Sequence, residues 1–116
     1  MSDYMALELG ETRIVRFVET DDVVYLELSG TIGDENTEQI RSLFTRLHKE
    51  STKSVVLDLR AVSHIWPKAL EWFPILQHWL EQSNRALSLN NLDSMLRQVF
   101  DMMGMSQFVH FTEDIY

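Results

Sequence analysis

The feature that most constrains the fold of this chain is a short apolar run near its middle. The run covers residues 54–59, Ser-Val-Val-Leu-Asp-Leu, and shows no alternation of polar and apolar positions. A short continuous apolar run is typical of a strand that is buried on both faces of a sheet. It therefore predicts a central β-strand, which the rest of the chain has to cover on both sides.

The segments before this run predict a hairpin and a helix. Residues 13–19 and 23–28 are rich in β-branched side chains, and Thr20-Asp21-Asp22 between them is a turn signal, so the two should pair antiparallel. Asp34 or Asn36 is expected to cap the helix that follows. Because this helix precedes residues 54–59, the strands on either side of it should be parallel, with a right-handed crossover. Its apolar face comprises Ile40, Leu43, Phe44 and Leu47, and the helix should end near residue 51.

The second half of the chain predicts two more helices and a strand between them. Pro67 suits the start of a helix that runs to about residue 83, and Pro74 should kink that helix because it removes one backbone hydrogen bond. Residues 86–89 predict the next strand, and Gly104 should stop the last helix. The apolar face of that last helix comprises Leu92, Met95, Leu96, Val99 and Met103, and residues 108–111 are a candidate edge strand.

This order of elements predicts an α/β fold with one mixed sheet of four to five strands, covered by about three to four helices. The length of 116 residues suits one domain, and an apolar content of 45% is enough for a packed core. Residues 1–12 fit either a short strand or an N-terminal arm that pairs at a sheet edge.

Charge and composition limit the partners that we expect. Eighteen acidic and ten basic residues give a net charge of −8, which repels phosphate backbones and anionic lipid, so nucleic acid and membrane surfaces are disfavoured. The absence of cysteine fits a cytoplasmic protein, and the first ten residues lack the basic cluster of a signal peptide. No apolar run approaches the roughly 20 residues that cross a bilayer. We expect no metal and no cofactor, because metal-ligand spacing is absent from His48, His64, His78 and His110.

Four stretches together resemble the STAS domain family, which includes the anti-sigma-factor antagonists. The resemblance covers residues 13–112, so we expect residues 13–116 to form one STAS-like domain. It implies a bacterial signalling protein that binds other proteins and is not an enzyme. The stretches are Val24-Tyr-Leu-Glu-Leu-Ser-Gly30, Val55-Val-Leu-Asp-Leu59 with Val62 and Ile65, Ala86-Leu-Ser-Leu-Asn-Asn91, and Val99 to Met105 with Phe108.

The junction after the central strand departs from the family pattern. The family usually carries Asp-Ser-Ser-Gly-Leu there, whereas this chain has Trp66-Pro67-Lys68-Ala69-Leu70. The serine that a partner kinase phosphorylates falls at Lys68, and lysine cannot take that modification. In the family, phosphate at this helix start adds negative charge and evicts the partner. We therefore expect a domain that binds without this switch. A second departure follows the second strand, where the family often has aspartate and this chain has Gly33, with Asp34 next.

The helix that starts at Pro67 has a second apolar stripe beside its core face. Trp72, Ile75 and Trp79 lie roughly 80–160° from the centre of that face, with Lys68 next to them. Two interpretations stay open: the stripe packs under a neighbouring helix, or it is a surface for a partner or for a homodimer. Tryptophan is enriched in binding hot spots, and the family meets its partners where this helix begins.

The predicted function is therefore a protein-interaction module whose partner is a regulatory protein such as an anti-sigma factor or a kinase. The alternative is an accessory subunit of a membrane transport or lipid-transport ATPase complex, since STAS-like domains also dock on those. The predicted partner-binding residues are Asp34, Glu35, His64, Trp66, Pro67, Lys68, Trp72, Ile75 and Trp79.

Overall fold

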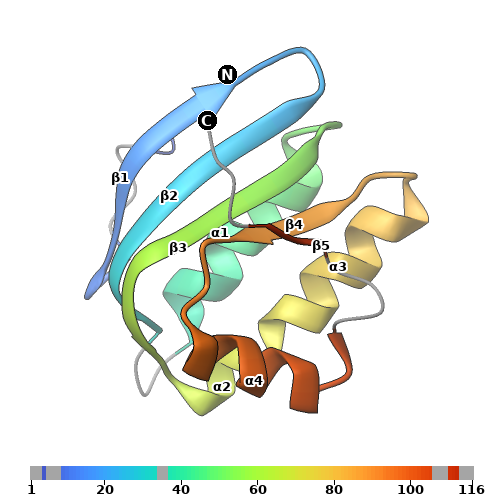
Figure 1. The fold of residues 1–116 in the computed structure, drawn as a ribbon. Coiled ribbons are helices and arrows are strands. Elements are labelled where there is room, and N and C mark those ends of the chain that lie inside the picture. The colour runs from blue at the N-terminus through green and yellow to red at the C-terminus, as the bar shows by residue number, and fades with distance from the viewer. Residues whose placement is uncertain (1–3, 5–8, 34–36, 106–109, 113–116) are drawn as a thin grey trace.

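Five strands form one mixed sheet in which the order of strands follows the chain (Figure 1). The computed structural model describes residues 4, 9–33, 37–105 and 110–112. The first two strands are antiparallel and the other neighbours are parallel, which confirms the predicted hairpin and the predicted parallel pairing across the first helix. The strands are β1 (Thr12–Glu19), β2 (Val23–Ile32), β3 (Ser54–Ile65), β4 (Leu87–Asn90) and β5 (His110–Thr112).

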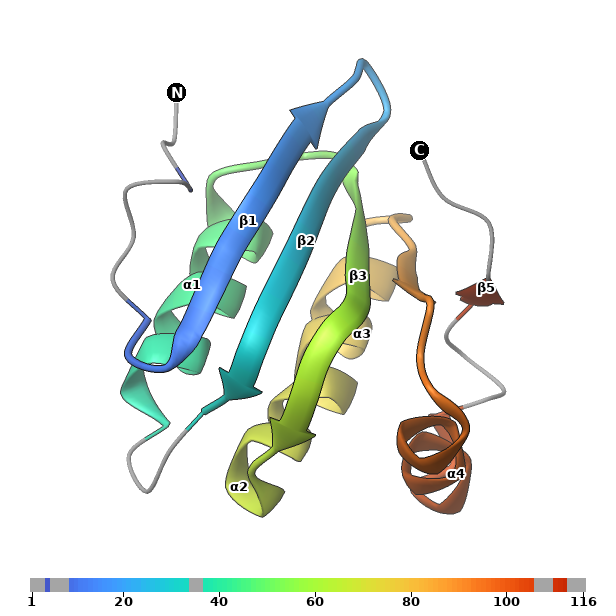
Figure 2. The same ribbon diagram turned by 60° about the vertical axis from the view of Figure 1, so that its left-hand side comes forward.

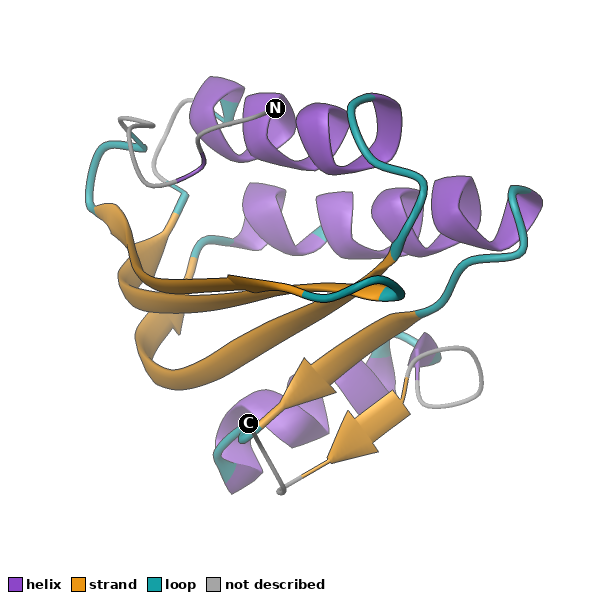
Figure 3. Cartoon of the chain, turned by 90° about the horizontal axis from the view of Figure 1, so that it is seen from above, coloured by secondary structure: helices purple, strands orange, loops and turns teal. Residues whose placement is uncertain are grey.

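Two long helices, which connect strands in the sequence, cover one face of this sheet. They are α1 and α3, which contact each other and lie side by side behind the strands (Figures 1 and 3). Another helix, α4, lies beyond the carboxyl end of β4 (Figure 2), and its Phe100 contacts Phe73 of α3. Among the described residues, every helix falls short of the length and apolarity needed to cross a bilayer. The helices are α1 (Glu38–Lys49), α2 (Pro67–Leu70), α3 (Trp72–Gln82) and α4 (Ser94–Met102).

The core lies between the sheet and the α1–α3 pair, as the periodicities predict. In β3, Val55, Leu57 and Leu59 belong to this core, whereas Val56 and Asp58 alternate with them and face the other way. All five residues are buried, so the central strand is covered on both faces, as predicted. The predicted α1 face, Ile40, Leu43, Phe44 and Leu47, is also buried in this core.

The prediction of one kinked helix over residues 67–83 is wrong. The helix stops at Leu70, and a new one begins at Trp72, so Pro74 lies in the first turn of α3. A proline has no N–H to donate to the carbonyl four residues earlier, which here belongs to Leu70, and its ring crowds that carbonyl. Helical hydrogen bonding therefore ends one turn before the proline, and the interruption separates Lys68 from the tryptophans of α3.

The apolar face predicted for the last helix is only partly buried. Phe100 is fully buried and Leu96 packs against the core, whereas the side chain of Met95 is 74% exposed, which corrects its assignment to the packed face. Asp93 caps the helix by accepting a hydrogen bond from the Leu96 N–H at 2.8 Å. Gly104 follows the helix with a φ of +77°, which confirms it as the stop signal.

The two chain ends are described only in part. Tyr4 is buried, and Leu9 forms an isolated antiparallel bridge with Thr12, while the remainder of the predicted N-terminal strand or arm lies outside the described residues. The predicted caps of the first helix, Asp34 and Asn36, also lie outside them. Thr37 is the residue before α1, and its side chain makes no capping hydrogen bond.

Candidate functional site

The carboxyl ends of β2 and β3 bring two loops together. Ile32 pairs with Ile65 at the end of the strands, and the Trp66 N–H donates to the Ile32 carbonyl at 3.0 Å. The loop after β2 then touches α2, because a Cβ on Gly33 would lie only 2.7 Å from the Cβ of Ala69. Gly33 also has a φ of +82°, which suits glycine alone at this close approach. Gly33, the first residue after β2, therefore packs directly against α2.

Four of the predicted binding residues lie where β3 leads into α2, and we call them the junction: His64, Trp66, Pro67 and Lys68. His64 is exposed, and its ring lies edge-on to the Trp66 ring with centroids 6.1 Å apart. Trp66 is half-buried and precedes α2 in an extended conformation, so Pro67 takes the first helical position. Lys68 is exposed in the single turn of α2. The acidic pair Asp34 and Glu35 lies outside the described residues.

The other three predicted residues lie on α3, and we call them the aromatic surface: Trp72, Ile75 and Trp79. The two indole rings have centroids 6.2 Å apart, and both tryptophans are half-buried. Ile75 is 36% exposed. Trp72 packs against the core, and Trp79 stacks on His48 of α1 with ring centroids 4.9 Å apart and planes at 22°. The stripe thus contacts the neighbouring helix and also reaches solvent, so features of both interpretations are present.

Sequence reasoning missed His48 and Arg85, which support the aromatic surface from behind. Arg85, in the link between α3 and β4, donates from Nη1 to the Ser51 carbonyl at 2.6 Å and from Nη2 to the His48 carbonyl at 2.9 Å. It thereby closes the carboxyl end of α1, whose last carbonyls attract a cation. No local pattern could have signalled this contact, because the two side chains are 37 positions apart.

A buried polar cluster lies on the opposite face of the sheet, around Asp58 of β3. This carboxylate is fully buried and accepts hydrogen bonds from the Tyr25 hydroxyl at 2.5 Å, the Asn91 amide at 3.0 Å and the Arg60 guanidinium at 2.7 Å. Burial alone would raise the pKa of Asp58, but the bonds from Arg60, Tyr25 and Asn91 outweigh it and lower that pKa. Burial and the bond to Asp58 raise the pKa of Tyr25 to about 12.

This cluster shapes the path of β3 toward the junction. The register of β2 and β3 shifts between Glu27 and Ser29, where β3 contains one residue more than β2. Asp58 accepts the backbone N–H of Arg60 inside that irregularity at 3.1 Å. Through Asn91, the same carboxylate is tied to the turn that leads into α4. The polar cluster therefore connects the bend of β3 with the start of α4.

The arrangement suits binding of a partner by apolar and cationic side chains. The junction offers the exposed Lys68 and the half-buried Trp66, and the aromatic surface offers the half-buried Trp72 and Trp79. Within the part of the chain that the structure describes, no three histidine or carboxylate side chains come close enough to hold a metal ion.

The sequence profile of the STAS domain matches residues 15–116. Together with the mixed sheet and its helix pair, this match shows that the chain belongs to the STAS domain family. No curated protein matches the chain significantly.

Solved structures of anti-sigma factor antagonists share the fold. The unphosphorylated form of the anti-sigma factor antagonist SpoIIAA superposes with a TM-score of 0.66 at 19% identity, over 87% of this chain and 90% of that one. The phosphorylated form of SpoIIAA, a Bacillus cell fate determinant, gives 0.66 at 17% identity, over 83% and 88%. A Thermotoga maritima protein provisionally assigned as such an antagonist gives 0.68 at 18% identity, over 86% of each chain. At these identities the likeness is one of fold.

Proposed function

We propose that this STAS domain is a non-enzymatic module that binds a regulatory protein, such as an anti-sigma factor or a kinase, without a serine phosphorylation switch. The observation that carries the proposal is Lys68, an exposed lysine in the first turn after β3, where the family resemblance expects the phosphoacceptor serine. SpoIIAA, which has the same fold, occurs in unphosphorylated and phosphorylated forms. A fixed positive charge cannot alternate between two such states.

The proposed interface combines the junction with the aromatic surface. Trp72 and Trp79 keep part of their rings accessible, and tryptophan contributes strongly to binding when a partner completes its burial. Lys68 would pair with an acidic group of the partner. The chain as a whole carries a net charge of −8, which would steer a partner with a basic patch toward it. Asp34 and Glu35, which precede α1 in the sequence, remain part of the predicted interface.

Affinity capture from native extract with three variants tests this interface. We expect Trp79→Ala and Lys68→Glu to retain a partner about 30-fold more weakly than the wild type, which corresponds to about 2 kcal/mol. Met102→Ala is the matched control, because Met102 is an 87% exposed apolar residue on α4, outside the proposed interface. Thermal melts of each variant would separate loss of binding from loss of folding.

The identity of the captured protein decides between the two functional classes. An anti-sigma factor or a kinase would support the signalling module, and a membrane transport ATPase would support the accessory-subunit alternative. Equal capture by the wild type, Trp79→Ala and Lys68→Glu would contradict the proposed interface.

The loss of the phosphorylation switch has its own test. We expect no phosphate within residues 63–70 after incubation with a captured kinase and ATP, as measured by mass spectrometry of the digested protein. Ser63 is the one hydroxyl in that segment, and it donates to the Gly30 carbonyl at 3.3 Å. Stoichiometric phosphate on Ser63 would show that a substitute switch exists.

A further inference from the structure

Three side chains from separate parts of the chain form a stack behind the aromatic surface. The Trp79 indole of α3 lies against the His48 imidazole of α1, and the His48 ring is in turn held by the Arg85 guanidinium. The distance between Arg85 Nη2 and His48 Nδ1 is 3.3 Å. Trp79 therefore stacks on a titratable ring that is itself in contact with a permanent cation.

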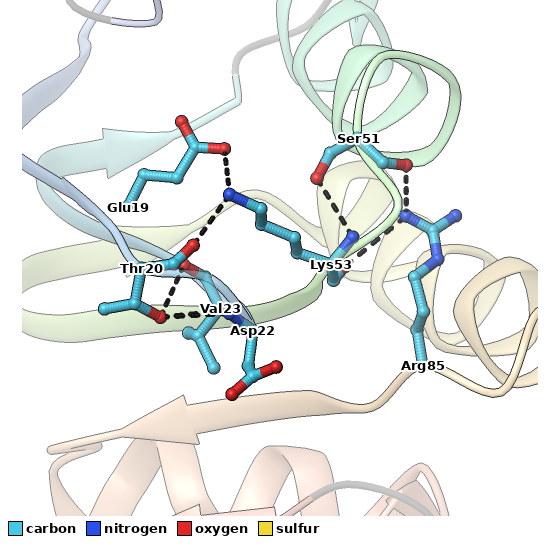
Figure 4. A network of polar contacts seen from close by, with 7 residues as sticks. All are labelled: Glu19, Thr20, Asp22, Val23, Ser51, Lys53 and Arg85. Atoms are coloured by element: carbon cyan, nitrogen blue, oxygen red, sulfur yellow. Dashed lines mark hydrogen bonds and ion pairs between the residues drawn. The ribbon is translucent and has the colours of Figure 1, made fainter.

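Arg85 is the fixed member of this stack. Besides the bonds to the Ser51 and His48 carbonyls, its Nη1 donates to the carbonyls of Leu47 at 3.3 Å and Lys53 at 3.4 Å. Figure 4 shows its guanidinium pointing at the segment that joins α1 to β3, with bonds to Ser51 and Lys53. Burial lowers the pKa of Arg85, but guanidinium groups stay protonated in proteins, so this side chain keeps both its charge and its place.

The contact with Arg85 specifies the protonation state of His48. A guanidinium group can only donate hydrogen bonds, so His48 Nδ1 has to accept, which requires a neutral imidazole with its proton on Nε2. Protonation would turn Nδ1 into a second donor and would place two positive charges about 3.3 Å apart. Since Arg85 is anchored by backbone carbonyls, the imidazole is the group that has to move.

We propose that His48 is a pH-sensitive contact that sets the position of Trp79 in the aromatic surface. The neutral ring holds the indole in its stacked position beside Arg85. The protonated ring is repelled by Arg85 and moves away from it, which displaces the indole stacked on it. Regulation of partner binding by this contact rests on the function proposed above. The pH response of the contact itself is independent of that function.

The electrostatic surroundings of His48 give the direction of the change. Burial lowers the pKa of His48 below its ordinary value of 6.5, and the positive charges of Arg85 and Lys49 lower it further. The side chain of α3 that faces the ring is the neutral indole of Trp79. The Ser83 hydroxyl, just after α3, accepts a hydrogen bond from Arg85 Nη2 at 3.4 Å. The stabilisation from the neutral ring is therefore complete above pH 6.5 and is lost as the pH falls through the lowered pKa.

Nuclear magnetic resonance of the ¹⁵N-labelled protein tests the contact without any partner. The indole N–H signal of Trp79 and the imidazole signals of His48 would be followed from about pH 8 to about pH 5. We expect both to shift with the same midpoint, below 6.5. The shift of the Trp79 signal should vanish in His48→Gln and persist in His78→Gln, the matched control with an exposed histidine on α3.

A second variant keeps the test decisive if His48→Gln does not fold. His48→Phe retains an aromatic ring for Trp79 and cannot titrate, so it should also abolish the shift. A Trp79 signal that titrates unchanged in both variants, or that does not titrate in the wild type, would overturn the inference. The outcome is separate from the capture experiment: coupled titration with normal binding by Trp79→Ala would support the contact and refute the proposed interface.

Discussion

At the scale of single residues, Asp58 makes the clearest prediction, because its carboxylate is completely buried with three side-chain donors. Asp58→Asn keeps the shape but removes the charge that Arg60 and Tyr25 satisfy. We expect this change to lower the free energy of unfolding by about 3 kcal/mol, measured by urea denaturation at neutral pH.

An exposed ion pair provides the control for that substitution. Asp101 pairs with Arg97 at 3.5 Å on the surface of α4, and both side chains are nearly half exposed. Asp101→Asn should therefore change the free energy of unfolding by no more than about 0.5 kcal/mol. Equal effects of the two substitutions would mean that the buried cluster contributes nothing beyond an ordinary surface charge.

The same carboxylate predicts how stability depends on pH. The pKa of Asp58 is lowered from its ordinary value of 3.8 in the folded protein, so the folded state binds this proton less readily than the unfolded state. Its contribution to stability is complete above that value and is lost as the pH falls through the lowered pKa. Urea denaturation over a series of acidic pH values should show a steeper loss for the wild type than for Asp58→Asn, and parallel curves would contradict this assignment.

At the scale of elements, the contact between the loop after β2 and α2 can be tested with a pair of glycines. Gly33 and Gly104 both have positive φ angles, +82° and +77°, so alanine is strained at either position. Only at Gly33 would the new Cβ meet another atom, the Ala69 Cβ at 2.7 Å, whereas nothing lies within 4 Å at Gly104. The comparison therefore isolates the cost of separating the loop from the helix.

We expect Gly33→Ala to lower the free energy of unfolding by about 2 kcal/mol or more, and Gly104→Ala to lower it by about 1 kcal/mol. Thermal and urea unfolding of both variants would measure the difference. If the two losses are equal, the loop after β2 is not packed against α2 as the structure has it, and the junction would need another description.

The elements also show how far the sequence alone predicts this fold. The hairpin, the crossover, α1 and the stop at Gly104 follow from periodicity and local turn chemistry, which short segments carry by themselves. The interruption at Glu71 was missed because the effect of Pro74 falls on a carbonyl one turn earlier. The extension of β3 to Ile65 was missed because Arg60 and Ala61 are exposed, and an irregular register hides such residues from a strand pattern.

The sequence predicted the residues of the junction and of the aromatic surface, but not His48 and Arg85, which contact the aromatic surface from behind. The junction residues are adjacent in sequence, and Trp72 and Trp79 stand two helical turns apart, so both groups could be assembled from spacing alone. The contacts of Trp79 with His48 and of His48 with Arg85 depend on how α1 docks beside α3. That docking is a property of the tertiary structure, and no local sequence pattern indicates it.

At the scale of the whole molecule, one core connects the sheet with both long helices. Phe73 of α3 contacts Phe44 of α1 and Phe100 of α4, each with ring centroids 5.1 Å apart. A domain with one shared core should unfold in a single transition. We expect unfolding curves from tryptophan fluorescence, which reports on the α2–α3 region, to coincide with those from far-ultraviolet circular dichroism. A fluorescence change at lower denaturant concentration would show that this region opens separately.

The order of strands across the sheet has a consequence for how the protein is made. Because β1 to β5 stand side by side in the order in which they occur in the chain, each new strand is added at the outer edge of those already formed (Figure 1). No strand has to be inserted between two that are already paired. The ribosome synthesises the chain in that same order, so each new strand can pair with the edge strand that was made before it. The spatial order of the strands therefore permits the sheet to assemble in the order of synthesis.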